Sequence, residues 1–561
     1  MPFTPYRGDR YLDADAVDAF VDTLAEAAGD WVTVQTIGTS RQGRPLRLVT
    51  VGWRGDHPDA PGERPAFWLD AGTHATEWTG VMAALYTLSS WVEALLAGDE
   101  ATMSSFRDTT AFVLPLISPD GLHATMHGTP PLRSTLRPPR ASTVRHGFAP
   151  ADLTGDGVVR WMRWRHPAGS WVPIEGHPVG MRPRTVDDDP SDAWFLAAEG
   201  RFVAWDGVRW VAAPLEHGLD LNRNYPVDWK PFSMFGMDAG DFPGSEPESR
   251  AVLSAVQERP HIAAALTNHT YTGCLLTPPG RRDTPLPGAD IARMQRLATD
   301  LVQGTGYRVF KVYPEFMYDP DKPIIGTWDD TLSTTFGIAA YTLELWNPYG
   351  WAGTELDDPV SMFRDPDPDV IRALLDQCVA EGAHHPWTPF HHPQLGPVEL
   401  GGVDELRTVR NPPEALLPEE CARGYVIAER LRKSVPRVTG SLAVAELGGQ
   451  GPDRVRRLEL VLENLGALST ASLDQGEVVG TAPAVRAEVV LGEGQELLDG
   501  PTERALHHLD GWMRHGFGRN PFYPGLPGRG HRAVASWTVR GEGTLTVTWH
   551  AGRAGTGQAE G

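Results

Sequence analysis

The feature that most constrains the fold is a set of short segments in which almost every residue is apolar. Ala66–Leu69, Ala111–Ile117 and Ala263–Leu266 lack the alternation of polar and apolar residues that a half-exposed strand has. A long helical stretch, Trp78–Leu96, separates the first two segments. Strands of this kind are buried on both sides, in sheets that helices cover. The sequence therefore predicts an α/β fold with a mixed central β-sheet and helices on both faces.

The periodicity changes toward the C-terminus. After a helix at about residues 418–434, apolar residues alternate with polar ones, as in Arg456–Glu463 and Val485–Leu491. Such alternation is typical of strands with one buried face. We therefore expect an α/β domain at residues 1–435, an all-β sandwich at 436–550 and a Gly-rich disordered tail at 551–561. Residues from about 122 to 217 are interpreted as an insertion in the first domain.

Composition excludes several classes of protein. The formal net charge of −22 repels phosphate, so we expect no nucleic-acid partner. The three cysteines are far apart, which rules out a disulfide framework and a Cys-rich metal site. Acidic residues interrupt the N-terminal segment, and the uncharged apolar run Trp78–Val92 is shorter than a membrane span. We expect a cytoplasmic protein with no membrane partner; its oligomeric state is left open.

Two histidines and a glutamate are the clearest candidates for metal ligands. His74 and Glu77 lie three positions apart in a loop before the long helix, so both side chains can reach one ion. His269 lies at the polar end of another apolar strand. Catalytic zinc sites have three such nitrogen and oxygen ligands and a water. Each residue alone has a plainer explanation, such as a hydrogen-bonded loop histidine beside a solvated glutamate.

Four other residues point to chemistry at the same place. Asn222 and Arg223 suit a carboxylate, because a guanidinium matches carboxylate geometry. Asp220 is suited to accept a hydrogen bond from a metal-bound imidazole and so to orient the ring. Glu344 lies within an apolar strand, where a carboxylate is costly unless it is paired or functional. A loop stabilised by local turns remains the alternative for the first three, and Glu399 is a local rival to Glu344.

In combination, these segments resemble the zinc carboxypeptidases of the carboxypeptidase A type. The resemblance covers roughly residues 5 to 350. It rests on seven ordered segments: Ile37–Arg44, Gly72–Trp78, Ser118–Gly121, Asp220–Tyr225, Ser245–Glu248, Thr267–Tyr271 and Leu343–Leu345. The ordered set is far more specific than any one motif.

The resemblance implies roles for the candidate residues. His74, Glu77 and His269 would bind one Zn²⁺ per chain, with a water as fourth ligand. Glu344 would be the general base and later the acid, and Asn222 and Arg223 would hold the terminal carboxylate of a peptide substrate. The expected activity is therefore that of a metallocarboxypeptidase.

The resemblance also implies an arginine that stabilises the oxyanion and a mobile tyrosine. We assign the arginine to Arg163, with Arg160 and Arg165 as alternatives, and name Tyr318 as the nearest tyrosine without assigning it. Two further clusters are interpreted as surface features. They are the arginines of residues 121–151 (Arg133, Arg137, Arg140, Arg145) and a Pro-rich loop with His384, His385, His391 and His392.

Two other functions stay open from the sequence. The same zinc site would serve an amidohydrolase acting on N-acyl amino acids or cell-wall-type peptides, since both carry a free carboxylate. A zinc-containing binding protein without turnover is the alternative from another class. The intact Glu344 and the three ligands argue against it.

Overall fold

The central sheet predicted from the apolar segments is present. The computed structural model describes residues 3–55, 63–130, 132–231, 233–319, 321–514, 522 and 530–561. Its main sheet has 8 strands and mixes parallel with antiparallel pairs. The strand order is β1 (Val32–Thr39), β2 (Pro45–Val51), β4 (Thr110–Leu114), β3 (Ala66–Ala71), β13 (Ile262–Thr270), β16 (Ala339–Leu345), β14 (Cys274–Thr277) and β15 (Arg308–Lys311).

Helices cover both faces of this sheet, as expected. In β3, Phe67 and Leu69 pack into one apolar core and Ala66 and Trp68 into the other. The first core is closed by α1 (Ala14–Ala28), α2 (Trp78–Leu96), α6 (Gly288–Leu301) and α12 (Leu417–Lys433). The second is closed by α5 (Pro247–Gln257) and α8 (Trp328–Phe336). Strand β3 is mostly apolar because neither of its faces meets water.

Helix α2 is longer than the apolar run used to judge it from the sequence. It has 19 residues and is apolar enough to cross a membrane by length and composition. Most of it is buried inside the protein, where it packs against α12 and β13. Its apolar character is therefore explained by its place in the core.

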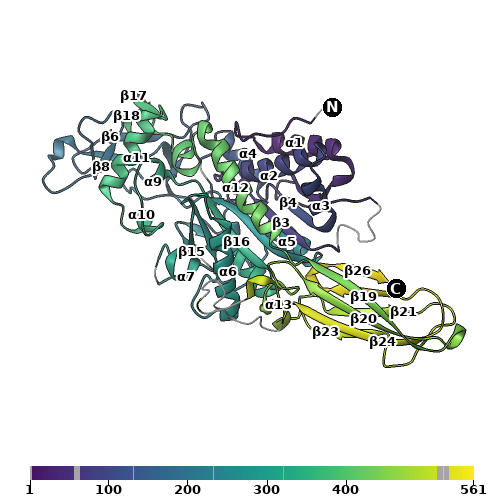
Figure 1. Ribbon diagram of the computed structural model, residues 1–561. Coiled ribbons are helices and arrows are strands. Elements are labelled where there is room, and N and C mark those ends of the chain that lie inside the picture. The colour runs from purple at the N-terminus through teal and green to yellow at the C-terminus, as the bar shows by residue number, and fades with distance from the viewer. Residues whose placement is uncertain are drawn as a thin grey trace.

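A second, outer sheet combines two parts of the chain. Its 6 strands are, in order, β17 (His384–His392), β18 (Gly396–Val403), β6 (Trp161–Arg165), β9 (Trp194–Ala198), β7 (Trp171–Pro173) and β8 (Met181–Pro183). Four strands come from the predicted insertion, and β17 and β18 come from residues 384–403. In Figure 1 this outer sheet lies at the far end of the molecule from the C-terminal domain.

The remaining elements of the first domain are α3 (Glu100–Asp108), α4 (Pro119–Met126), α7 (Val312–Glu315), α9 (Pro348–Trp351), α10 (Ser361–Arg364), α11 (Pro368–Ala380), β5 (Gly147–Pro150), β10 (Gly200–Val203), β11 (Ser233–Met234) and β12 (Met237–Asp238).

The histidine cluster near residue 384 was wrongly predicted to be a loop. It forms strand β17, which pairs antiparallel with β18. His392 is buried, and its Nε2 donates a hydrogen bond to the carbonyl of Gly200 at 2.8 Å. The prolines misled the sequence analysis, because edge strands tolerate residues without an N–H donor.

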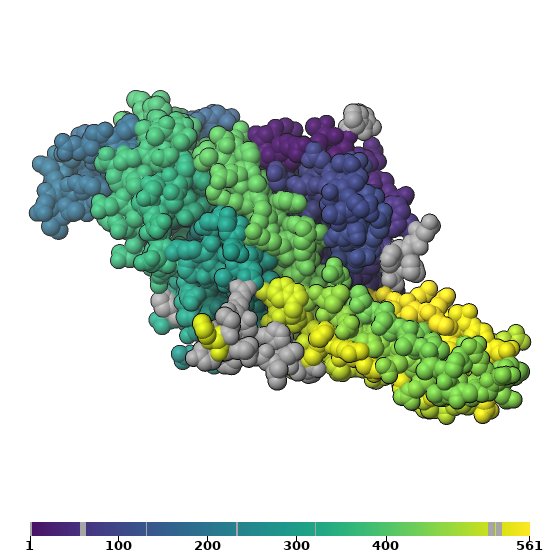
Figure 2. All heavy atoms as spheres, viewed as in Figure 1, coloured from purple at the N-terminus to yellow at the C-terminus, as the bar shows by residue number. Residues whose placement is uncertain are grey.

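The C-terminal domain consists of two four-stranded antiparallel sheets, seen as a separate lobe in Figure 2. One sheet contains β19 (Val438–Gly448), β20 (Val455–Asn464), β24 (Arg532–Arg540) and β22 (Glu496–Leu497). The other contains β23 (Glu503–Leu506), β21 (Val485–Val490), β25 (Thr546–Ala551) and β26 (Thr556–Glu560). Alternate residues such as Leu458, Leu460 and Leu462 face the core between the sheets. A short helix, α13 (Asp474–Val478), lies against α8.

The predicted disordered tail at residues 551–561 is wrong. Strand β26 pairs with β25, and Arg553 between them is 1% exposed. Its guanidinium donates to the carbonyls of Ala471, Pro260, Ile262 and Phe336. Three of these carbonyls belong to the first domain, so this buried cation joins the two domains. Glycine content alone did not reveal that the segment completes a sheet.

Candidate active site

The three residues predicted to bind metal come together in the structure. His74 and Glu77 follow β3, and Glu77 is the residue immediately before α2. His269 is near the carboxyl end of β13, the neighbour of β3 in the sheet. One ligand atom from each of the three lies within 4.8 Å of the others, and all three side chains are buried. The carboxyl ends of adjacent parallel strands place these side chains at one edge of the sheet.

The hydrogen bonds around His74 fit a cation at this point. His74 Nε2 lies 3.2 Å from Asp220 Oδ1, which can only accept, so this nitrogen carries the proton in the neutral ring. Nδ1 of His74 then has a lone pair, yet it faces Glu77 Oε1 at 2.8 Å and His269 Nδ1 at 3.0 Å. Glu77 Oε2 is 2.9 Å from His269 Nδ1. Burial also lowers the pKa of His269, which favours the neutral ring that metals bind.

An arginine that the sequence analysis had treated as a surface residue lies beside this cluster. Arg133 Nη1 donates to Glu77 Oε1 at 3.0 Å and its Nε donates to Asp220 Oδ2 at 3.1 Å. Burial alone would lower the pKa of Arg133, but Asp220 and Glu77 outweigh it and raise the pKa. The guanidinium thus stays charged next to the candidate metal ligands.

The sequence contained one signal for Arg133. It is the first arginine after Ser118–Gly121, one of the segments that carry the family resemblance. Its carbonyl accepts a hydrogen bond from the backbone N–H of Ala75 at 2.8 Å, which ties its loop to the loop of His74. Assigning residues 122–217 to an insertion as a whole hid this position.

Arg163, the arginine chosen from the sequence, is engaged elsewhere. It lies on β6 of the outer sheet, where its Nε donates to Glu399 at 2.7 Å. Its guanidinium is stacked between the rings of Trp194 and Trp387, at 4.5 and 4.0 Å. The prediction that Arg163 lies at the site is therefore wrong, and the arginine that lies beside the cluster is Arg133. The same contact explains Glu399, which pairs with Arg163.

Glu344 lies next to the cluster, on β16, the strand beside β13 in the sheet. It is the register partner of His269 in the parallel pair β13–β16, so both residues reach the same edge of the sheet. Burial, together with the negative charge of Glu77, raises the pKa of Glu344 well above its usual value. A carboxyl held in this way is suited to exchange protons near neutral pH.

Asn222 and Arg223 belong to a short 3-10 turn, Leu221–Arg223, that follows Asp220. Asn222 Oδ1 accepts a hydrogen bond from the backbone N–H of Trp328 at 2.9 Å, at the start of α8. Arg223 Nη1 donates to the carbonyl of Asn222 at 2.7 Å. Both side chains are at most 9% exposed. The turn is held rigidly, with one guanidinium in the same cavity as Glu344.

Several of the site residues line one cavity of about 1250 Å³. One wall consists of the site residues, namely Glu77, Arg133, Asp220, Arg223, Tyr318 and Glu344. The cavity lining also includes residues 155–161 of the insertion and residues 403–407. Tyr318, the tyrosine named from the sequence, therefore does lie at the site, where burial and Glu344 raise its pKa.

Two family models match the chain. Residues 17–353 match the model described as zinc carboxypeptidase. Residues 441–560 match a domain of unknown function, DUF8731. The first match ends before β17, so the outer sheet includes strands outside it.

Individual relatives match over shorter stretches. Carboxypeptidase A4 of Mus musculus is 23% identical over 303 residues, which are 53% of this chain and 55% of that protein. Carboxypeptidase B of Astacus astacus is 28% identical over 111 residues, 20% of this chain and 33% of that protein. The chain thus spans about half or less of the length of these curated relatives.

Solved structures that match have low overall similarity. Bovine thrombin-activatable fibrinolysis inhibitor, in complex with tick carboxypeptidase inhibitor, has a TM-score of 0.44 at 15% identity, covering 76% of this chain and 97% of that one. The murein-tripeptide amidase MpaA of Escherichia coli O157 has a TM-score of 0.26 at 14% identity, covering 61% and 91%.

Proposed function

The chain belongs to the zinc carboxypeptidase family, and from this premise we propose that it hydrolyses the C-terminal peptide bond of peptides. The observation that carries the proposal is the buried cluster of His74, Glu77 and His269, which shares one edge of the sheet with Glu344. Two imidazoles and one carboxylate are a donor set suited to zinc. Zinc held by these three side chains would polarise the substrate carbonyl and lower the pKa of a bound water.

Each remaining residue has a task that follows from its position. Glu344, with its raised pKa, would accept the proton of the attacking water and later deliver it to the leaving amine. Arg133 would stabilise the negative charge that develops on the carbonyl oxygen, since its charged guanidinium lies at the cluster. Asp220 would fix the orientation and proton position of His74.

Recognition of the substrate would depend on Arg223 and Asn222. The Arg223 guanidinium lies in the cavity with Glu344 and offers a planar donor group to a carboxylate. Asn222 Oδ1 is already used by Trp328, so its amide nitrogen would be the donor to the substrate. This arrangement favours peptides with a free terminal carboxylate over amidated ones.

The test is mass spectrometry of a peptide pool incubated with the purified protein. Stepwise loss of C-terminal residues, blocked by a chelator and absent for amidated peptides, is the expected result. The pool also reads out the preferred terminal side chain. If no peptide is shortened while zinc is bound, peptide hydrolysis is refuted, and N-acyl amino acids and cell-wall-type peptides become the substrates to test with the same protein.

A further inference from the structure

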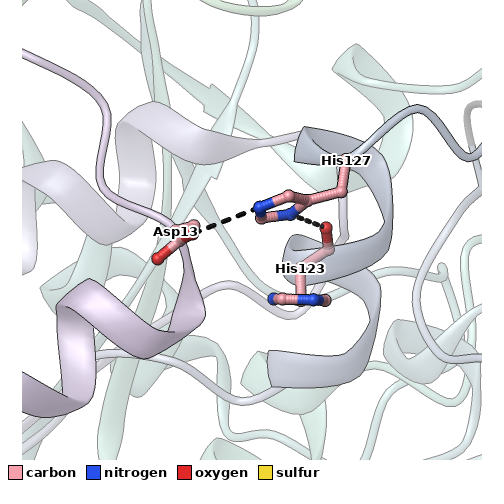
Figure 3. A group of neighbouring side chains, drawn as sticks. All are labelled: Asp13, His123 and His127. Carbon is pink, nitrogen blue, oxygen red and sulfur yellow. Dashed lines mark hydrogen bonds and ion pairs between the residues drawn. The ribbon is translucent and has the colours of Figure 1, made fainter. Parts of the chain in front are cut away.

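A second group of side chains that could hold a metal ion lies outside the buried cluster, although His127 also lines the large cavity. Asp13 precedes α1, and His123 and His127 lie one helical turn apart at the end of α4 (Figure 3). One ligand atom from each of the three lies within 4.8 Å of the others. This group uses none of the residues of the first cluster. Unlike that cluster it is partly exposed, so ions can reach it from solvent.

The hydrogen bonds of His127 leave two acceptors facing each other. His127 Nδ1 lies 2.7 Å from the carbonyl oxygen of His123, which can only accept, so Nδ1 carries the proton of the neutral ring. The other nitrogen, Nε2, then has a lone pair and faces Asp13 Oδ2 at 3.4 Å. A lone pair and a carboxylate oxygen repel each other unless a cation lies between them. That cation is either a proton or a metal ion.

The neighbouring groups favour a metal ion. The rings of His123 and His127 are stacked, with centroids 4.2 Å apart and planes at 26°. Nδ1 of His123 is buried and accepts or donates no hydrogen bond among the described residues. It lies 3.8 Å from Asp15 Oδ2, and Asp15 is itself paired with Arg44 at 2.5 Å. The site therefore has an imidazole nitrogen of His123 with no hydrogen bond among the described residues, close to the carboxylates of Asp13 and Asp15.

The side chains are also held in place before any ion binds. Asp13 Oδ1 caps α1 by accepting a hydrogen bond from the N–H of Ala16 at 2.9 Å, which directs Oδ2 toward His127. The carbonyl of His123 fixes the ring of His127. Little conformational freedom is lost on binding, and such pre-organised sites bind more tightly.

We propose that Asp13, His123 and His127 bind a second divalent transition-metal ion, such as Zn²⁺, Ni²⁺ or Cu²⁺. Two imidazoles and one carboxylate suit these ions better than Mg²⁺ or Ca²⁺, which prefer oxygen ligands. The ion links the start of α1 to the end of α4. From there the chain passes through His127, Gly128 and Thr129, which line the large cavity, to Arg133. The ion thus anchors the segment that leads to Arg133.

Calorimetric titration tests the proposal. The protein is first loaded with one equivalent of Zn²⁺ and then titrated with Zn²⁺. We expect a second saturable binding event of one equivalent, and anomalous scattering at the zinc edge should locate this ion between Asp13 and His127. In a double variant, His123→Gln with His127→Gln, the second event should disappear while the first equivalent is retained.

Two control variants make the result decisive. His146→Gln removes a partly exposed histidine near Asp206, 4.0 Å away, and should leave both binding events intact. His269→Ala should lose the buried ion and keep the second, which shows that the two sites fill independently. Uptake of one ion by the wild-type protein, or equal uptake by the double variant, would overturn the proposal and leave a protonated His127 paired with Asp13.

Discussion

Replacing Arg133 with alanine should abolish most turnover while leaving the metal ligands able to bind zinc. The guanidinium lies 3.0 Å from Glu77 Oε1 and shares the cavity with Glu344. In the proposed function, Arg133 is the main positively charged side chain beside the carbonyl of the peptide bond that is cleaved. Its removal leaves the developing oxyanion with one stabilising partner fewer.

The size of the effect follows from this role. Loss of one donor to an oxyanion lowers kcat by about 10²–10³-fold, which corresponds to about 2.7–4 kcal/mol of transition-state stabilisation. Zinc should be retained, because removing a positive charge beside Glu77 and Asp220 does not weaken their attraction for a cation. The expected signature is therefore a large drop in kcat with unchanged metal content.

The matched control is Arg163→Ala. Arg163 is held by Glu399 and two tryptophan rings in the outer sheet, so its loss should lower stability and leave kcat within a few-fold of wild type. Both variants are assayed for kcat and KM on a peptide found in the pool experiment, and for zinc by elemental analysis. If Arg133→Ala keeps kcat within tenfold, or if Arg163→Ala loses as much, the placement of the oxyanion partner is wrong. Partial rescue of Arg133→Ala by added guanidinium would separate a charge effect from a folding defect.

Three other predictions follow from described contacts. Glu344→Gln should abolish turnover with zinc still bound. In the wild-type protein, kcat/KM should fall as the pH is lowered through the raised pKa of Glu344, because the protonated carboxyl cannot accept a proton. An acid limb at the position of an ordinary glutamate, near pH 4.3, would contradict the role of burial. Asp220→Ala should weaken zinc binding about 10–100-fold, since His74 loses the carboxylate 3.2 Å from its Nε2. Competition with a chelating dye measures the zinc affinity, and an unchanged affinity would refute the role of Asp220. Arg553→Ala should cost about 4 kcal/mol, roughly 1 for each of the four hydrogen bonds lost. It should lower the melting temperature far more than Arg540→Ala, which removes an exposed ion pair with Glu496. Equal shifts would argue against a joint between the domains.

The parts of the molecule that the sequence predicted depend on local patterns. Consecutive apolar residues marked the strands that are buried on both sides, as in β3. The metal-ligand cluster was found because His74 and Glu77 are close in sequence and His269 ends an apolar strand. In each case the information lies within a few residues of the element concerned.

What the sequence analysis missed depends on contacts between distant segments. Arg133 and Arg163 are both arginines in the same polar stretch, and only the fold reveals that one faces Glu77 and the other faces two tryptophans. Arg553 lies in a Gly-rich segment with no apolar pattern, yet four carbonyls from three places in the chain surround it. Burial of a polar residue by remote partners leaves no trace in local periodicity.

The outer sheet has a consequence for the order in which the protein folds. Within it β6 pairs with β18, and the bond between Arg163 and Glu399 links residues 236 positions apart. Pairing at such separation carries a large loop-closure entropy and is slow. The metal ligands also depend on long-range pairing, since His74 and His269 lie beside the β3–β13 pair and are 195 positions apart. We therefore expect both the ligand cluster and the outer sheet to form late in folding, so that zinc uptake during refolding reports when β3 and β13 have paired.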